Sequence, residues 1–266
     1  MELDDSLRDS DPEFVMRVLS RAYQAWRLIR QGQQLRKAIG TNTSLATCCD
    51  ALWASPFRPL QKRSEALELF GLVNSLRPNA ICEIGTAGGG TAFLFTRSAA
   101  ANAMLISVDI AFDYSRRVAI RQFAENQQTL FCIQGDSHTT DTVRTVASLL
   151  HDRQLDVLFI DGDHTYEGVS TDFELYRPLV RKGGLIIFHD IVPDFRTKHG
   201  SDTLAFSGGV PQFWEELKLH YAHREIVEDA NQDGYGIGIL FWPGGLVVSG
   251  SENSELDLEL VSDARI

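Results

Sequence analysis

The sequence predicts an α/β fold in which a doubly wound sheet of seven strands ends in a closing antiparallel hairpin, after an N-terminal helical extension. Five apolar, strand-like runs alternate with helical patterns between residues 80 and 190, which is typical of parallel strands joined by crossover helices. Two more apolar runs, at 222–228 and 236–241, flank the turn-forming sequence Asn-Gln-Asp-Gly at 231–234, which indicates the hairpin.

Length, charge and cysteine usage limit the class of protein. A chain of 266 residues suits one α/β domain with an extension better than two full domains. The net charge of −11 argues against a nucleic-acid partner, because phosphate binding needs a basic surface. The N-terminus lacks a leader pattern, no run of 18 apolar residues occurs, and the four cysteines lack C-x-x-C spacing. We therefore expect free thiols, no membrane partner and a cytoplasmic location.

The N-terminal region is expected to contain one long helix. Residues 11–38 carry apolar side chains mostly three and four positions apart, which is the period of an amphipathic helix. Its apolar stripe is expected to pack on its own domain, or else to form a contact between subunits of a homo-oligomer or a lid over the substrate. Residues 41–57 are mixed in composition and lead into Ser-Pro-Phe-Arg-Pro at 55–59, which is interpreted as a linker.

A second helix is predicted over residues 61–76, and Arg77-Pro78 ends its apolar pattern. We therefore divide the chain into a helical extension at 1–58, a core domain at 59–243 and an acidic tail at 244–266. Since the carboxyl ends of parallel strands meet at one edge of a sheet, we expect the ligand at that edge. The five parallel strands are expected at residues 80–84, 104–109, 129–134, 155–161 and 185–190.

The first strand runs into a glycine-rich turn, which points to a nucleotide cofactor. The sequence at 83–91 is Glu-Ile-Gly-Thr-Ala-Gly-Gly-Gly-Thr, and a helical stretch follows it. Glycines in such a turn let backbone N–H groups and a helix N-terminus approach a ligand closely. The dinucleotide pattern G-x-G-x-x-G is not matched, because Ala87 or Phe93 stands where a glycine is required. An NAD interpretation is therefore weakened.

The pattern that does occur in this turn, E-x-G-x-x-x-G-G-T, resembles motif I of the class I S-adenosylmethionine-dependent methyltransferases. The resemblance implies that S-adenosylmethionine binds at the turn. The candidate cofactor-binding residues here are Glu83, Gly85, Thr86, Gly89, Gly90 and Thr91.

Acidic and polar residues also follow the next strands. Asp109 ends the second strand 20 residues beyond Gly89, about the distance at which an acid meets the ribose hydroxyls of an adenine nucleotide. Asp136 and Ser137 follow the third strand, where methyltransferases of this type commonly contact the adenine. Asp161 ends the fourth strand, and we add these four residues to the candidate cofactor-binding set.

The fourth and fifth strands carry a more specific pattern. The sequences Asp-Val-Leu-Phe-Ile-Asp-Gly-Asp-His-Thr-Tyr-Glu at 156–167 and Gly-Gly-Leu-Ile-Ile-Phe-His-Asp-Ile at 183–191 resemble a family of metal-dependent O-methyltransferases. That family includes the cephalosporin-hydroxylase-like proteins and the macrolide sugar O-methyltransferases, and residues 209–217 are similar to it too. The resemblance covers roughly residues 60–242 and implies a Rossmann-like fold.

The resemblance implies metal ligands and a general base. Asp161, His189 and Asp190 match the metal motif, and His164 matches the histidine proposed as the base in the macrolide enzymes. Two carboxylates favour Mg²⁺, whereas an imidazole suits Mn²⁺ or another transition metal better, so the identity of the divalent ion stays open. Relatives often have an acid at the position of His189. The remaining histidines are expected on the surface: His138, His151, His199, His220 and His223.

The predicted function is S-adenosylmethionine-dependent, divalent-metal-assisted O-methylation of a hydroxyl on a small molecule, such as a sugar or secondary metabolite. Two alternatives are an NAD-linked oxidoreductase and a non-catalytic, cofactor-binding scaffold protein that works through the N-terminal helix. The absent dinucleotide pattern and the closing hairpin disfavour the oxidoreductase.

Overall fold

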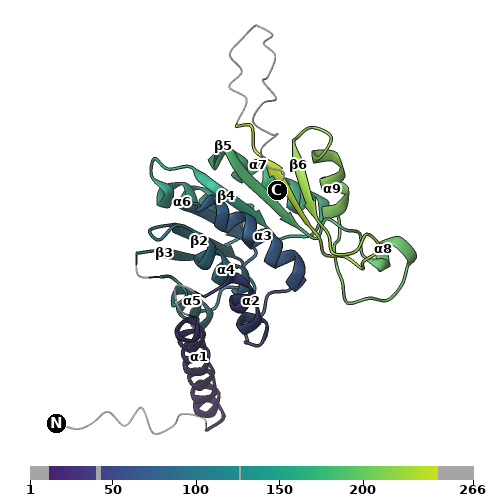
Figure 1. The fold of residues 1–266 in the computed structure, drawn as a ribbon. Helices are drawn as coiled ribbons and strands as arrows, with labels where there is room; N and C mark the ends of the chain where they lie inside the picture. Colours follow the sequence, from purple (N-terminus) through teal and green to yellow (C-terminus); the bar gives the residue numbers. More distant parts are fainter. Residues whose placement is uncertain (1–11, 40–42, 126, 245–266) are drawn as a thin grey trace, which may run out of the picture.

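A computed structural model describes residues 12–39, 43–125 and 127–244 of the chain (Figure 1). Seven strands form one sheet, as the sequence predicted, and their order is β3-β2-β1-β4-β5-β7-β6. The first five strands are parallel, whereas β7 runs antiparallel to both β5 and β6. The strands are β1 (Ala80–Ile84), β2 (Met104–Asp109), β3 (Thr129–Gln134), β4 (Leu155–Ile160), β5 (Val180–His189), β6 (His223–Ile226) and β7 (Ile237–Phe241).

Helices cover both faces of the sheet, so the core has two layers. One apolar layer lies between the sheet and α2 (Leu45–Trp53), α3 (Arg63–Leu76), α4 (Gly90–Ser98) and α5 (Tyr114–Arg121). The other lies between the sheet and α6 (Thr140–Leu150), α7 (Tyr166–Tyr176) and α9 (Val210–Leu217). A 3₁₀ turn, η2 (Arg177–Leu179), precedes β5, and the short α8 (Phe195–His199) follows it. Apolar burial on both faces is the arrangement that a doubly wound parallel sheet requires.

The stretch at 41–57 differs from the expectation. It contains α2, which begins at the N-cap Ser44 and buries Cys48, Cys49 and Leu52. Phe57, just beyond α2, is also buried and packs edge-to-face on Phe123. The described part of this stretch therefore belongs to the core of the domain rather than leading loosely into it.

The long N-terminal helix α1 (Pro12–Ala38) extends away from the body, beyond α5 (Figure 1). Its C-terminal half packs on the domain, with Leu35 buried and Gly32 so close to α5 that a Cβ atom would lie 3.1 Å from the Ala119 carbonyl oxygen. Its N-terminal half has an exposed apolar face. We define that face as Val15, Met16, Val18, Leu19, Tyr23 and Trp26, all of which are exposed.

The acidic tail predicted at 244–266 lies outside the described residues, apart from Gly244. Within the described ranges, every helix is too short or too polar to cross a lipid bilayer.

Candidate functional site

The carboxyl ends of β1, β2, β3 and β4 surround a cavity of about 490 Å³. The residues that follow each of these strands line it, from Gly85 after β1 to Gly162 after β4. This is the edge at which ligands bind in open α/β sheets. Of the turn residues expected to bind cofactor, Gly85 lines this cavity.

The glycines of the turn are required mainly by protein packing. Gly85 has a φ of 83°, and a Cβ atom there would collide with the Asp161 carbonyl oxygen at the end of β4. Gly89 has a φ of 91°, and its Cβ position lies 2.6 Å from the Ile120 side chain. A Cβ at Gly90 would collide with the Phe57 carbonyl oxygen. Gly89 and Gly90 thus allow α4 to pack on its neighbours, and their role in cofactor binding stays a prediction.

Two threonines of the turn are also placed away from the larger cavity. Thr86 and Thr91 are buried, and with Gly90 they line a second cavity of about 30 Å³. This smaller space lies between the turn and the segment before α3, and the Thr86 hydroxyl donates to the Val108 carbonyl at 3.5 Å.

Asp109 joins the ends of β1 and β2 at the cavity wall. Its Oδ2 accepts a hydrogen bond from the Ala87 amide at 2.8 Å, and its Oδ1 accepts one from the Ala111 amide at 2.7 Å. An ionised carboxylate has about four acceptor positions, so each oxygen keeps one for a ligand hydroxyl. Asp109 lines the cavity, as its predicted role requires.

Glu83 lies below the cavity rather than in its wall. The side chain is buried, and Oε1 accepts a hydrogen bond from the Ser107 hydroxyl at 2.6 Å. Burial raises the pKa of this carboxyl to about 8, although the hydrogen bond from Ser107 acts in the opposite direction. Glu83 therefore supports the turn from inside the core in its protonated form at neutral pH.

At the far end of the cavity, Asp136, Ser137 and His138 follow β3. The Asp136 Oδ1 accepts a hydrogen bond from the His138 amide at 2.9 Å, and the Tyr176 hydroxyl donates to the Ser137 carbonyl at 3.1 Å. His138 was expected on the surface, yet it lines the cavity. Its position directly after Ser137 was the one signal in the sequence that could have placed it there.

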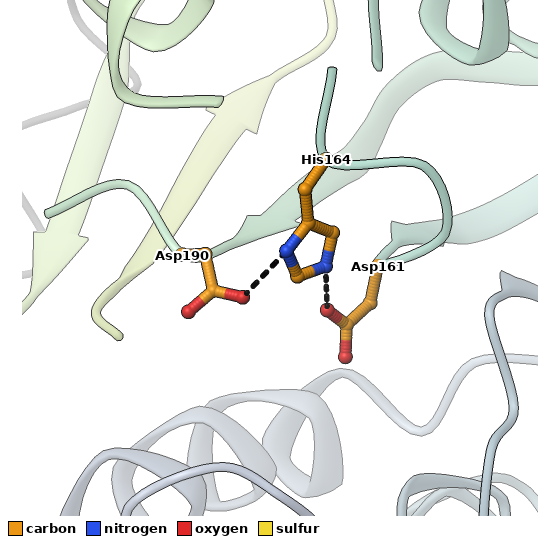
Figure 2. Close-up of side chains that lie close together, drawn as sticks. All are labelled: Asp161, His164 and Asp190. Atoms are coloured by element: carbon orange, nitrogen blue, oxygen red, sulfur yellow. Dashed lines mark ion pairs between the residues drawn. The ribbon is translucent and has the colours of Figure 1, made fainter. Parts of the chain in front are cut away.

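Next to the cavity, the ends of β4 and β5 bring two aspartates and two histidines together. His164 Nε2 lies 3.5 Å from Asp161 Oδ1, and His164 Nδ1 lies 3.5 Å from Asp190 Oδ2 (Figure 2). His189 Nδ1 lies 3.1 Å from the same Asp161 oxygen and 3.0 Å from the same Asp190 oxygen. One oxygen of each carboxylate is thus aimed at both imidazole rings.

The charges in this cluster shift the pKa values of Asp161, His164 and His189. Burial opposes ionisation of Asp161, but the neighbouring His189 charge and hydrogen bonds from both histidines lower its pKa below the usual value. Burial would lower the pKa of His164, yet Asp161 and Asp190 raise it to about 9. The same two carboxylates raise the pKa of His189 well above its ordinary value against the effect of burial. The cluster therefore holds positive charge between its carboxylates.

Two further residues hold the carboxylates of Asp161 and Asp190 in place by hydrogen bonds. The Gln61 side-chain amide donates to Asp161 Oδ2 at 2.8 Å, and the Tyr235 backbone amide donates to Asp190 Oδ1 at 3.2 Å. Asp190 has a φ of 63°, a left-handed conformation that is uncommon for residues other than glycine. Sequence reasoning missed Gln61 and Tyr235, because both come from distant segments and carry no motif.

A family model described as a methyltransferase domain matches residues 82–191. This range runs from β1 to the residue after Asp190, and so it includes every strand end that lines the larger cavity. Residues 82–191 are thus similar to a methyltransferase domain. The resemblance to S-adenosylmethionine-dependent methyltransferases inferred from the sequence is confirmed at this level.

Among curated proteins, the chain is similar to the uncharacterised protein y4gI of Sinorhizobium fredii. The two are 31% identical over 180 residues, which cover 64% of this chain and 18% of that protein. The chain thus spans less than a fifth of the length of this relative.

Solved structures share the fold of the methyltransferase domain. An O-methyltransferase from Bacillus cereus in complex with SAH is 18% identical, with a TM-score of 0.55, over 75% of this chain and 91% of that one. The methyltransferase MycE of the mycinamycin biosynthetic pathway, in complex with Mg, SAH and mycinamycin VI, is 17% identical, with a TM-score of 0.53. That match covers 77% of this chain and 55% of MycE. The α/β, Rossmann-like architecture is therefore the one found in these methyltransferases.

Proposed function

We propose that this protein is an S-adenosylmethionine-dependent O-methyltransferase that acts on a hydroxyl group of a small molecule. The observation that carries the proposal is the cavity at the strand ends of the methyltransferase domain, with the two-aspartate, two-histidine cluster beside it. The cavity suits the methyl donor, and the cluster suits activation of the hydroxyl group that receives the methyl group. Asp161 lines the cavity and belongs to the cluster, so the two parts are adjacent.

In this proposal the donor lies along the cavity. Asp109 binds the ribose hydroxyls with its free acceptor positions, and the segment of Asp136 and Ser137 meets the adenine. The methionine part then lies near Gly85 and Asp161, where the methyl group faces the cluster. Structures of the same fold in complex with SAH support a donor of this class.

The cluster suits a divalent metal ion. Asp161, His164 and Asp190 each offer a ligand atom within 4.8 Å of the others, and the buried Nε2 of His189 has no hydrogen-bond partner in the described part of the chain. Two carboxylates with an imidazole suit Mn²⁺, Fe²⁺ or Zn²⁺ as well as Mg²⁺. We propose Asp161 and Asp190 as ligands, with His189 as the third, because its Nδ1 lies 3.1 Å from Asp161 Oδ1 and 3.0 Å from Asp190 Oδ2. A bound ion would orient the acceptor hydroxyl and lower its pKa.

His164 is proposed as the general base. Its Nδ1 lies 2.7 Å from the Phe206 carbonyl oxygen, which can only accept a hydrogen bond, so Nδ1 carries a proton. Nε2 is then the atom that takes the hydroxyl proton of the methyl-accepting substrate. The raised pKa of His164 depends on the negative charges of Asp161 and Asp190. Proton acceptance at neutral pH thus requires that these charges be compensated.

A sugar or another secondary metabolite is the acceptor class that we propose, and the exposed apolar face of α1 is proposed as a contact between copies in a homo-oligomer. The acceptor class follows the MycE structure with mycinamycin VI and the sequence resemblance to macrolide enzymes. The α1 contact follows the exposure of six large apolar side chains on a helix that extends from the body.

The deciding experiment is methyl transfer from labelled S-adenosylmethionine to a library of sugars, phenols and other hydroxylated compounds, with and without divalent metal. Transfer that stops on chelation and returns with metal supports the proposal. Calorimetry with S-adenosylhomocysteine and with NAD separates it from an oxidoreductase. Binding of NAD without binding of S-adenosylhomocysteine would refute it.

A further inference from the structure

Three consecutive residues between β6 and β7 have left-handed backbone conformations. They are Gly234, Tyr235 and Gly236, with φ angles of 70°, 61° and 83°. A tyrosine rarely adopts such a conformation, and a strained residue persists only where the surrounding structure holds it. Tyr235 is hydrogen-bonded to Asp190, which is itself left-handed with a φ of 63°. The contacts that hold this 234–236 turn therefore bear on the cluster at the ends of β4 and β5.

On one side, the 234–236 turn is joined to the residues that follow β5. The Tyr235 amide donates to Asp190 Oδ1 at 3.2 Å, and the Val192 amide donates to the Tyr235 carbonyl at 2.9 Å. The Ile191 amide donates to the Gly236 carbonyl at 3.4 Å. A Cβ atom at Gly236 would lie 2.6 Å from the Val192 side chain, so the two segments are in close contact. A displacement of the turn would therefore reorient the Asp190 carboxylate.

On the other side, the turn and the residues before it are held by one buried carboxylate of α3. Glu65 is only 1% exposed, and its Oε2 accepts a hydrogen bond from the Gly236 amide at 3.1 Å. Its Oε1 accepts one from the Glu228 amide at 3.2 Å and one from the Gln232 side-chain amide at 2.8 Å. All three contacts use the carboxylate as an acceptor, so an amide in its place would lose at least one of them.

The start of α3 thus reaches both aspartates of the cluster. Gln61, four residues before Glu65, donates directly to Asp161 Oδ2 at 2.8 Å. Glu65 reaches Asp190 through the 234–236 turn. Glu65 is not itself in the group of described residues whose ligand atoms lie within 4.8 Å of one another. Its influence on a bound ion would therefore be indirect.

We propose that Glu65 is a positioning residue for the metal site, because it holds the 234–236 turn in the conformation that orients Asp190. Metal ligands are commonly oriented by hydrogen bonds from surrounding groups, and loss of such a partner typically weakens metal binding by about 10- to 100-fold. The Tyr235 amide is such a partner of Asp190, and Glu65 acts one contact further out. This inference rests on the proposed function, since it concerns the ion that the cluster is proposed to bind.

The test compares Mn²⁺ binding by the full-length wild-type protein and by Glu65→Gln in a calorimetric titration. The amide keeps the shape of the carboxylate, but its NH₂ group cannot accept a hydrogen bond from the N–H that it faces. We expect Glu65→Gln to bind Mn²⁺ about tenfold more weakly than the wild type. Its affinity for S-adenosylhomocysteine should stay within about twofold of the wild type, because the donor cavity at the ends of β1 to β4 is lined by other segments.

Glu68→Gln is the matched control on the same helix. Glu68 is half-exposed, and its Oε1 lies 2.6 Å from Arg224 Nη2 on β6. This variant therefore also removes one acid and one contact between α3 and the hairpin, but it leaves the 234–236 turn untouched. It should keep the wild-type affinity for Mn²⁺. A purely structural role of Glu65 would instead weaken the binding of Mn²⁺ and S-adenosylhomocysteine alike, or change only the stability toward urea.

Amide hydrogen exchange gives a second readout that requires no metal ion. The Tyr235 and Val192 amides join the turn to the end of β5. Both should exchange faster in Glu65→Gln than in the wild type and in Glu68→Gln, because local opening of the turn becomes easier. Unchanged protection of both amides would overturn the proposal.

The outcomes separate this inference from the proposed function. If the wild type and Glu65→Gln bind Mn²⁺ equally well, the role of Glu65 is wrong and the metal site stands. If the wild type binds no divalent ion, the metal part of the proposed function fails, and amide exchange decides whether Glu65 orients Asp190. Should Glu65→Gln not fold, Gln232→Met removes one of the three donors to Glu65 and should change both readouts in the same direction.

Discussion

The buried Glu83 makes stability depend on pH in a way that one substitution should remove. Glu83 is enclosed in the core below the glycine turn, and burial raises its pKa from an ordinary 4.5 to about 8. A carboxyl whose pKa is raised on folding stabilises the protein at low pH, and this contribution is lost as the pH rises through the folded pKa. Glu83→Gln, an amide of the same shape, does not titrate and should escape the loss.

The magnitude follows from the shift. Between pH 4.5 and pH 7, Glu83 ionises in the unfolded chain but stays protonated in the folded chain. The free energy of unfolding therefore falls by roughly 3 kcal/mol by pH 7. Above the folded pKa the full shift applies, and the effect levels off at about 5 kcal/mol. The Gln carbonyl can accept the Ser107 hydrogen bond as Oε1 does, and any packing cost of the amide is the same at each pH.

Urea unfolding of wild type and Glu83→Gln between pH 5 and pH 8 measures the effect. The variant should gain stability relative to wild type at each step upward in pH. Glu167→Gln, at an exposed position on α7, is the control and should show little pH-dependent difference. A difference between Glu83→Gln and wild type that stays constant over this range would refute the reasoning.

Three other predictions concern the site and α1. Asp161→Asn and Asp190→Asn should each abolish divalent-metal binding in a calorimetric titration while S-adenosylhomocysteine still binds, and full turnover after exhaustive chelation would contradict a metal role. His164→Ala should lower kcat by roughly 10²- to 10⁴-fold with metal and donor binding intact, whereas loss of metal binding would make His164 a ligand instead of the base. Replacing Leu19 and Trp26 with Ser should shift the protein to a smaller species in sedimentation, and a wild type that is already monomeric would rule out the α1 contact.

Most of the fold could be predicted from local pattern. The apolar runs at β1, β2 and β3 are bounded by polar or glycine-containing turns, and the observed strands have the predicted ends. β5 begins earlier than predicted, at Val180, because Val180 pairs with Leu155 before the register shifts. The pattern before Leu185 is polar and shows no strand, so only the pairing with β4 reveals it.

The local sequence pattern could not predict contacts between segments that are distant in the sequence. Helix α2 was missed, because its mixed sequence becomes a helix through burial of Cys48 and Cys49 against the core. The cluster at the ends of β4 and β5 was predicted from the resemblance. Gln61, however, binds Asp161 from a position 100 residues away in the sequence, and no motif predicts this contact. The same reason explains His138, which lies in the turn after β3 and has Asp172 of the distant helix α7 beside it.

The hairpin at the end of the domain sets when the site can form during synthesis. The residues after β5 are held by the segment before β7, since the Tyr235 amide binds Asp190 and the Val192 amide binds the Tyr235 carbonyl at 2.9 Å. Domains generally fold as units. The donor cavity at the ends of β1 to β4 and the orientation of Asp190 are therefore expected to form together, once the last strand has been synthesised. Chains cut short before β7 would then lack an ordered acceptor-activating cluster.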